Sequence, residues 1–209
     1  AGMIAVIDYG RGNLFSIGQA LQVLGVEYLI TDNTDIVAKA DKIILPGVGA
    51  FGDAMERLKS NDMDRAILDA AKTDKQILGI CLGMHLLATQ SEEFGNYNGL
   101  NLIEGHVSRL QASSEDTNEN SRIPNMGWRW VKVLNNHKYF AGIRESPYFY
   151  FAHSYAYRCA HSEDIAGVIS INGEHVPAII GRGNVWGFQF HPEKSGPIGL
   201  KLLNRFINS

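Results

Sequence analysis

Short apolar runs alternate with amphipathic stretches through the first half of the chain. The apolar run at residues 3–8 predicts a buried strand, and residues 13–24 carry apolar side chains three or four positions apart, which predicts a helix ended by Gly25. Further strands are expected at residues 26–30, 42–45 and 76–80, and further helices at residues 35–40, 50–59, 63–72 and 82–90. Strands that alternate with helices indicate parallel βαβ units and an α/β fold.

The second half consists mainly of strand-like runs that follow one another closely. They cover residues 107–110, 128–133, 148–151, 165–171, 178–182 and 185–190, and a final helix is expected at residues 199–207. These strands suggest antiparallel additions to the same sheet. Residues 112–121 are polar, acidic and free of aromatic side chains, which predicts a mobile surface loop. We find no repeat or linker, so we expect one domain over residues 1–209, with Ala1 and Gly2 as a cloning scar.

The composition excludes several functional classes. Hydrophobic residues make up 45% and charged residues 20% of the chain, which is ordinary for a globular protein, and the net charge of -3 offers no positive field for nucleic acid or an anionic membrane. No apolar run approaches the ~20 residues of a membrane span. Because the first strand is expected at residues 3–8, we expect no export signal, and the two cysteines, Cys81 and Cys159, lie outside any CxxC pair. We therefore expect a cytoplasmic protein without a zinc site or redox dithiol.

A candidate nucleophile lies where the fourth strand meets the following helix. The segment Gly79-Ile80-Cys81-Leu82-Gly83 matches the G-x-nucleophile-x-G elbow, with cysteine in place of serine. The small glycines permit a sharp turn that holds the nucleophile in strained backbone geometry. At a helix N-terminus, the dipole and a nearby base favour the thiolate. On its own, the pattern fits a buried structural cysteine equally well.

A candidate base and its orienting carboxylate follow the last strand-like run. His191 and Glu193 flank Pro192, and alternation places their side chains on one side of the chain, within reach of each other. Alone, this segment is more typical of a surface turn. Together with the elbow it predicts a triad in which Cys81 attacks, His191 accepts and returns protons, and Glu193 fixes the histidine tautomer.

A glycine-rich loop supplies the third part of the expected site. Pro46-Gly47-Val48-Gly49 follows the third strand, and its glycines let backbone amides approach an oxyanion. We assign the oxyanion hole to the N–H groups of Val48 and Leu82. The same glycines would also suit a plain strand-to-helix turn.

Six segments carry a resemblance to a known family. They are residues 8–14 (DYGRGNL), 46–51 (PGVGAF), 79–84 (GICLGM), 124–128 (PNMGW), 153–155 (HSY) and 189–195 (QFHPEKS). Over essentially its whole length the chain resembles the class I glutamine amidotransferases, and among them the amidotransferase subunits of imidazole glycerol phosphate synthase, the bacterial histidine-pathway enzyme. The elbow and His-Pro-Glu are shared across the class. The opening segment, the Pro-Gly-Val-Gly loop and Met-Gly-Trp separate this subunit from relatives serving GMP, anthranilate, carbamoyl phosphate or pyridoxal phosphate synthesis.

The resemblance implies a fold and an activity. The fold would be a three-layer α-β-α sandwich with a mixed, mostly parallel central sheet and a cysteine nucleophile elbow. The chain would hydrolyse glutamine to glutamate and ammonia without a cofactor or metal. The ammonia would pass to a (β/α)8-barrel cyclase subunit, with which the chain forms a heterodimer that makes imidazole glycerol phosphate and AICAR.

The resemblance also implies binding residues. Glutamine would lie beside Gly47, Gly49, His85, His153, Ser154 and Tyr155. The cyclase subunit would contact Gly10, Arg11, Asn13, Met126, Trp128 and Lys194.

Two positions depart from the family pattern. Residue 85 is His where the family usually has Gln beside the substrate, and residue 11 is Arg in a partner-facing loop that usually carries a small or apolar residue there. These changes leave open a paralogue that supplies ammonia for amidation of a surface-polysaccharide sugar. Arg11 would need solvent or an acidic residue of the partner. Two other hypotheses are a non-catalytic, partner-binding relative and a different cysteine hydrolase on the same sandwich. The intact nucleophile and base argue against the first, and Glu193 and the Pro-Gly-Val-Gly loop argue against the second.

Overall fold

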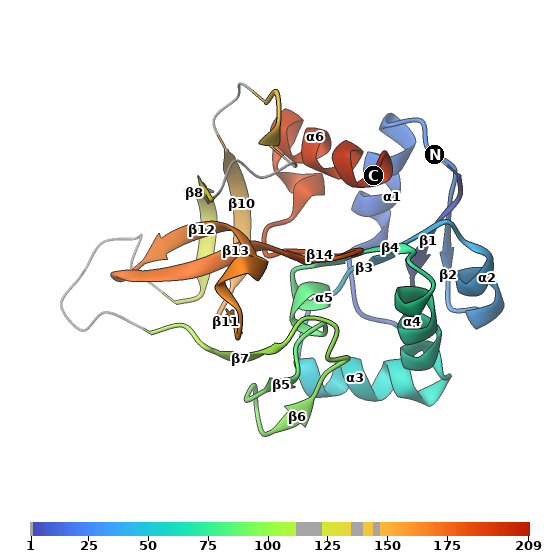
Figure 1. Ribbon diagram of the computed structural model, residues 1–209, viewed down its shortest axis with the longest axis horizontal. Helices are drawn as coiled ribbons and strands as arrows, with labels where there is room; N and C mark the ends of the chain where they lie inside the picture. The colour runs from blue at the N-terminus through green and yellow to red at the C-terminus, as the bar shows by residue number, and fades with distance from the viewer. Residues whose placement is uncertain (1, 112–122, 135–139, 144–146) are drawn as a thin grey trace.

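An eight-stranded mixed sheet forms the centre of the molecule (Figure 1). The computed structural model describes residues 2–111, 123–134, 140–143 and 147–209. The strands of the sheet are β1 (Ile4–Ile7), β2 (Tyr28–Thr31), β3 (Lys42–Leu45), β4 (Gln76–Ile80), β9 (Lys132–Val133), β12 (Ile165–Ile171), β13 (Glu174–Arg182) and β14 (Val185–Phe188). Their order is β2-β1-β3-β4-β14-β13-β12-β9. The first five in this order are parallel and the last three antiparallel, which confirms the expected mixed, mostly parallel sheet.

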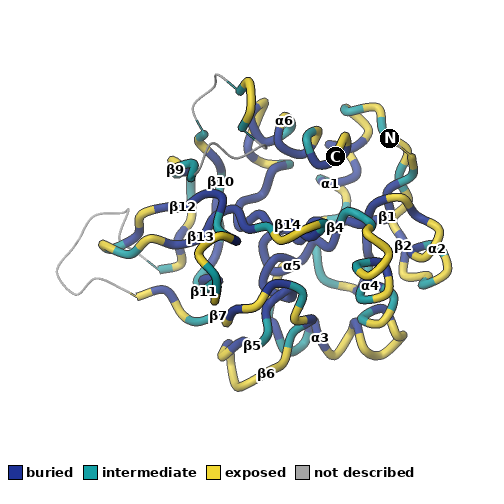
Figure 2. Tube along the Cα trace, viewed as in Figure 1, coloured by how far each residue is buried: buried dark blue, intermediate teal, exposed yellow. Residues whose placement is uncertain are grey.

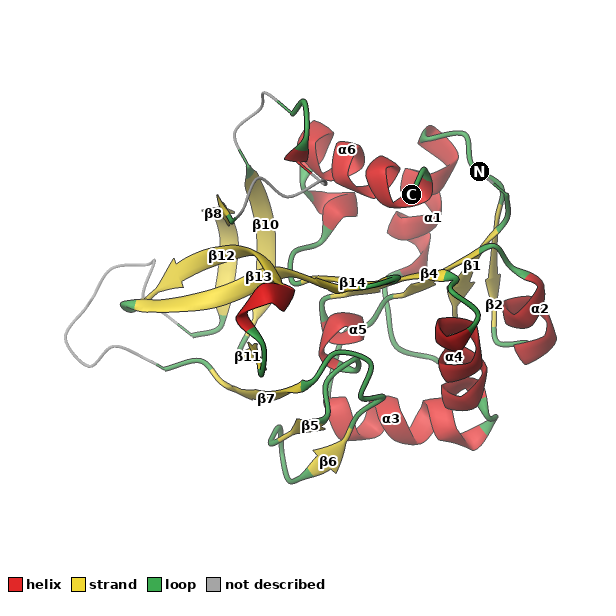
Figure 3. Cartoon of the chain, in the orientation of Figure 1, coloured by secondary structure: helices red, strands yellow, loops and turns green. Residues whose placement is uncertain are grey.

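Helices cover both faces of this sheet (Figure 3). Those on one face are α1 (Leu14–Val23) and α6 (Gly196–Ile207), and those on the other are α2 (Thr34–Lys39), α3 (Phe51–Ser60), α4 (Met63–Lys72) and α5 (Leu82–His85). Successive side chains of β1 point to opposite faces, so Val6 packs with α1 and α6 while Ile7 packs with α3 and α4. The buried residues therefore form two layers of core, one on each side of the sheet (Figure 2), and the predicted α-β-α sandwich is confirmed.

The other strands form two smaller sheets. One pairs β8 (Asn125–Trp130) with β10 (Tyr148–His153), and the other has the order β11 (Tyr155–Cys159), β7 (Gly105–Arg109), β5 (Gln90–Ser91), β6 (Tyr97–Asn98). The expectation that the second-half strands all extend the main sheet was therefore wrong for β7, β8 and β10. Alternation in sequence shows that a segment is a strand, but it does not show which strand it pairs with. Strands β5, β6 and β11 were not predicted, and residues 112–121 lie outside the described residues.

The expected helix at residues 82–90 is much shorter than predicted. Helix α5 ends at His85, and the next turns are tight, with Leu87 N donating to Met84 O at 3.1 Å. The carbonyl of Leu86 then accepts from Leu100 N at 2.8 Å, so the backbone bonds to a distant loop instead of continuing the helix. Within the described residues, no helix has the length and apolar character needed to cross a membrane.

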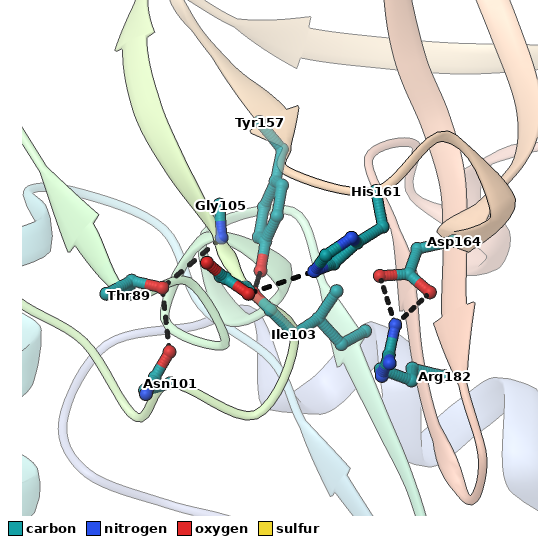
Figure 4. A network of polar contacts seen from close by, with 9 residues as sticks. Thr89, Asn101, Ile103, Gly105, Tyr157, His161, Asp164 and Arg182 are labelled. Atoms are coloured by element: carbon teal, nitrogen blue, oxygen red, sulfur yellow. Dashed lines mark hydrogen bonds and ion pairs between the residues drawn. The ribbon is translucent and has the colours of Figure 1, made fainter.

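A polar network anchors this loop to the neighbouring strands (Figure 4). Thr89 Oγ1 donates to Asn101 Oδ1 at 2.7 Å and accepts from Gly105 N at 3.2 Å. Nearby, Arg182 forms two hydrogen bonds with the buried Asp164, at 3.0 and 3.2 Å. Because its polar groups satisfy one another, we interpret this cluster as a structural support for the four-stranded sheet.

Candidate active site

Cys81 occupies a strained turn between β4 and α5. Its backbone has φ 54° and ψ -112°, in a region that only glycine adopts readily. Close packing explains the glycines of the elbow: a Cβ at Gly83 would collide with the carbonyl of Leu45, and one at Gly79 would collide with the backbone of Gly83. The Cys81 side chain stands at the first turn of α5, with Sγ 3.7 Å from the carbonyl oxygen of Ala152.

The parallel pairing of β4 with β14 brings His191 to the elbow. Ile80 pairs with Phe188, and Cys81 N donates to Phe188 O at 2.8 Å, so the chain that leaves β14 runs beside the sulfur. His191 Nδ1 lies 3.0 Å from Glu193 Oε1, and both side chains are buried. The second carboxylate oxygen of Glu193 is also buried, without a hydrogen-bond partner among the described residues.

The surroundings of His191 favour its charged form. Burial alone would lower the pKa of His191, but hydrogen bonds to Cys81 and Glu193 and the negative charge of both groups raise this pKa to about 10. The imidazole is therefore protonated at neutral pH, so a cation lies beside the Cys81 sulfur. Ser195 holds the segment in place, since its hydroxyl donates to His191 O at 2.6 Å and accepts from Tyr150 N at 3.0 Å. Sequence reasoning did not identify Ser195.

A pocket of about 380 Å³ opens over the elbow. Its walls are formed by Val48, Gly49, Ala50, Cys81, Leu82, His85, Glu93, Phe94, Arg109, Ala152, His153, Ser154 and Tyr155. The two expected oxyanion-hole residues and five of the six expected substrate residues are in this set. The exception is Gly47, which is buried behind the loop against Tyr9 and Leu82. The Tyr9 hydroxyl donates to the carbonyl of Pro46 at 2.8 Å and so fixes the start of the loop.

Two buried histidines of the pocket already have partners within the chain. His85 Nε2 lies 2.7 Å from Gln189 Oε1, while His153 Nδ1 lies 2.8 Å from Tyr155 O and its Nε2 lies 2.9 Å from Asn125 Nδ2. Burial is the main cause that lowers the pKa of His85 to about 4 and that of His153 to about 3. Both rings are therefore neutral at physiological pH, and His153 has no ring nitrogen left for a ligand.

The two charged residues of the pocket, Glu93 and Arg109, were missed by sequence reasoning. Glu93 is buried, its pKa is raised by burial, and its Oε1 accepts from Phe51 N at 3.3 Å at the start of α3. Arg109 ends β7, where it pairs with Tyr155 of β11. Arg109 has no ion-pair partner among the described residues. No local sequence motif marks either position. Glu93 reaches the pocket through the course of the chain after α5, and Arg109 through the pairing of β7 with β11.

The residues expected to contact a partner lie on elements that adjoin the site. Their exposed members are Gly10, Asn13, Met126, Trp128 and Lys194, and Arg11 is partly exposed. The short helix η4 (Pro192–Lys194) contacts both α1 and β10, which joins these elements into one region. Trp130 and Tyr148 extend the exposed aromatic surface next to Trp128, with the Trp130 and Tyr148 ring centroids 4.7 Å apart.

Among the described residues, neither the second cysteine nor a cluster of metal-ligating side chains offers a competing site. Burial is the largest cause that raises the pKa of the Cys159 thiol to about 12, so this thiol stays protonated at physiological pH. Among the described residues, no group of three or more His, Cys, Asp and Glu side chains could hold a metal ion.

Comparison with known proteins identifies similar chains. The family model for class-I glutamine amidotransferases matches residues 5–209. The imidazole glycerol phosphate synthase subunit HisH of Bacillus subtilis is 43% identical over 98% of this chain and 95% of the relative, and that of Bacillus cytotoxicus is 43% identical over 98% and 93%. The structure of PurLQS from Thermotoga maritima has a TM-score of 0.71 and 23% identity, covers 99% of this chain and 97% of that one, and supports the fold alone.

Proposed function

The chain belongs to the class I glutamine amidotransferase family, and we propose that it is the glutaminase subunit of an imidazole glycerol phosphate synthase in the cytoplasm. The observation that supports this most strongly is the strained Cys81 beside the buried pair formed by His191 and Glu193. The similarity to HisH subunits, which extends over nearly the whole chain, points to histidine biosynthesis.

The geometry supports a two-step hydrolysis. The Cys81 thiolate attacks the side-chain amide carbon of glutamine, and the carbonyl oxygen becomes an oxyanion that accepts hydrogen bonds from the N–H groups of Val48 and Leu82. Protonated His191 gives its proton to the amide nitrogen, so the C–N bond breaks and ammonia leaves a γ-glutamyl thioester. His191, now neutral, takes a proton from water as the water oxygen attacks the thioester. The C–S bond then breaks, releasing glutamate and restoring the thiolate beside protonated His191, which Glu193 orients.

Glu93 and Arg109 match the two charges of an amino-acid substrate. They are the charged members of the pocket wall, since His85 and His153 are neutral at physiological pH. The α-ammonium group of glutamine would bind Glu93, whose carboxylate lacks a cationic partner within the described residues. The α-carboxylate would bind Arg109, whose planar guanidinium suits a carboxylate. The pocket would therefore select free glutamine over an amide without these groups.

The ammonia acceptor would be a (β/α)8-barrel cyclase subunit. The HisH relatives are named as subunits, which implies a partner subunit. The exposed surface formed by Met126, Trp128 and Lys194 lies on elements that adjoin the catalytic segment and would face this partner. Such an arrangement would pass ammonia from Cys81 to the cyclase without release into solvent.

Two assays test this function. Glutamine hydrolysis should be slow for the isolated chain and rise strongly when the cyclase subunit is added, because coupling avoids wasting ammonia; high activity of the chain alone would contradict the coupling. A histidine auxotroph that lacks its own amidotransferase subunit should grow when given this gene with its natural cyclase neighbour. Failure to grow, with both proteins soluble, would instead favour the polysaccharide paralogue that Arg11 and His85 left open.

A further inference from the structure

Gln189 is fully buried and lies between His85 and the nucleophile. Its Oε1 is 2.7 Å from His85 Nε2, and its Nε2 is 4.0 Å from Cys81 Sγ. His85 lies one helical turn beyond Cys81 and is bonded to it through the backbone, with His85 N donating to Cys81 O at 3.2 Å. The three residues therefore form a closed ring of contacts behind the sulfur.

The chemistry of this ring fixes the direction of its hydrogen bonds. Because His85 is neutral, one ring nitrogen donates and the other accepts. Only the tautomer protonated at Nε2 can donate to the carboxamide oxygen of Gln189. With this oxygen held by His85, the carboxamide N–H group is turned toward the sulfur. The opposite orientation would place a carbonyl oxygen against a thiolate, and two negative groups repel.

We propose that His85 is a positioning residue, which holds the Gln189 carboxamide so that its N–H group stabilises the Cys81 thiolate. His85 then acts through Gln189 and does not itself need to bind glutamine. This explains how a histidine can stand at a position expected to carry glutamine, because either side chain can donate to Gln189 Oε1. This role of His85 belongs to the same site as the proposed glutaminase function. It rests on that function only in that the Cys81 thiolate is taken to be the catalytic nucleophile.

The reactivity of the Cys81 thiol measures this effect without glutamine or a partner. The full chain is treated with iodoacetamide between pH 5 and pH 10, and peptide mass spectrometry follows the alkylation rate of Cys81. Among the described residues, the titratable side chains that face the sulfur or line its pocket are Tyr9, His85, Glu93, Arg109, His153, Tyr155, His191 and Glu193. The variants change only His85 among these, so a shift of the profile reports the His85–Gln189 pair.

Four variants separate the effect of the hydrogen-bond donor from that of side-chain shape. His85→Leu removes the donor, and Gln189→Leu removes the carboxamide; each should move the midpoint of the alkylation profile up by about one pH unit, as expected for loss of a hydrogen bond to a charged group. His85→Gln keeps a donor and should leave the midpoint near the wild-type value. The double variant His85→Leu/Gln189→Leu should shift no further than either single variant, because both act on one hydrogen bond.

Any other outcome would contradict the proposal that His85 acts on Cys81 through Gln189. Unchanged midpoints in both leucine variants would show that Gln189 does not stabilise the thiolate. A shift in His85→Leu without one in Gln189→Leu would mean that His85 acts directly, and a shift in His85→Gln equal to that in His85→Leu would mean that the donor is irrelevant. Urea unfolding of each variant identifies a protein that has lost its fold, in which case His85→Gln still tests the donor. A wild type that lacks glutaminase activity even with the cyclase subunit present, but shows these shifts, would refute the proposed function and keep this inference.

Discussion

Arg11 Nε lies 2.7 Å from Asp53 Oδ2, so an ion pair joins the glycine-rich turn after β1 to helix α3. Arg57, one turn further along α3, approaches the same carboxylate oxygen at 3.4 Å. From the sequence, we expect the Arg11 guanidinium to contact either solvent or an acidic residue of the partner. The structure provides an acid from the chain itself, 42 positions away. The unusual charge at position 11 therefore does not require a different partner.

This ion pair predicts that substitution of Asp53 lowers the stability of the fold more than substitution of Arg11. Arg11→Met should lower the free energy of unfolding by less than about 1 kcal/mol, because the pair is partly exposed. Asp53→Asn should cost more, since it leaves the Arg11 and Arg57 cations facing each other. Urea unfolding at low and high salt measures both, and the difference should shrink at high salt. A larger loss from Arg11→Met would show that Asp53 is not the shared partner.

The proposed triad predicts an order of catalytic losses. His191→Ala should reduce kcat in the complex by several orders of magnitude, because it removes the proton carrier. Glu193→Gln should reduce kcat less, since the imidazole remains and only its orientation and charge are affected. Steady-state glutamine hydrolysis with the cyclase subunit present gives both values. If Glu193→Gln were the more damaging variant, the roles assigned to these two residues would be wrong.

The buried histidines predict loss of stability in acid. The folded-state pKa values of about 4 for His85 and about 3 for His153 lie below the ordinary value of 6.5. The unfolded chain therefore takes up protons first as the pH falls, so the stability these groups confer is complete above pH 6.5 and is lost as the pH falls toward 4 for His85 and toward 3 for His153. Each histidine contributes a slope of up to about 1.4 kcal/mol per pH unit in that window.

Replacement of one histidine isolates its contribution to the pH dependence of the free energy of unfolding. His85→Gln should flatten the decline in the free energy of unfolding between pH 6.5 and pH 4, as measured by urea denaturation. His175→Gln is a matched control for the substitution itself, because this histidine is exposed. Identical pH profiles for the wild type and His85→Gln would show that His85 is protonated equally in both states.

The charged pocket residues predict selectivity for the α-groups of glutamine. Arg109→Met should lower kcat/KM for glutamine by about tenfold to a hundredfold, the range for losing one charge-assisted hydrogen bond. It should have little effect on 4-aminobutanamide, which lacks the α-carboxylate. Glu93→Gln should show the converse pattern with the monoamide of glutaric acid, which lacks the α-ammonium. Equal losses on all substrates would indicate a structural role for both residues.

The first half of the fold could be predicted closely because its signals are local. Strand β3, helix α4 and strand β4 have the expected bounds, since apolar runs and helical spacing act over a few residues. The smaller sheets could not be predicted, because β8 pairs with β10 and β7 with β11 across long stretches of chain. Helix α5 is short for the same reason: its continuation bonds to residues 100–102.

The candidate site was predictable where a short motif carries the chemistry. Cys81 and the pair His191 and Glu193 follow from segments of a few residues, and the strand pairing brings these segments together. Gln189 as the partner of His85 could not be foreseen, because the two are 104 positions apart. The family resemblance implied a substrate contact for His85, whereas the structure shows its Nε2 bonded to Gln189 within the chain.

Covalent labelling tests most directly whether Cys81 is the nucleophile of a glutaminase. The complex with the cyclase subunit is incubated with a diazoketone analogue of glutamine, and peptide mass spectrometry locates the adduct. We expect a single adduct on Cys81, none in Cys81→Ser, and retained ammonia-dependent turnover in that variant. An adduct on Cys159, or glutamine-dependent turnover that survives Cys81→Ser, would show that Cys81 is not the nucleophile.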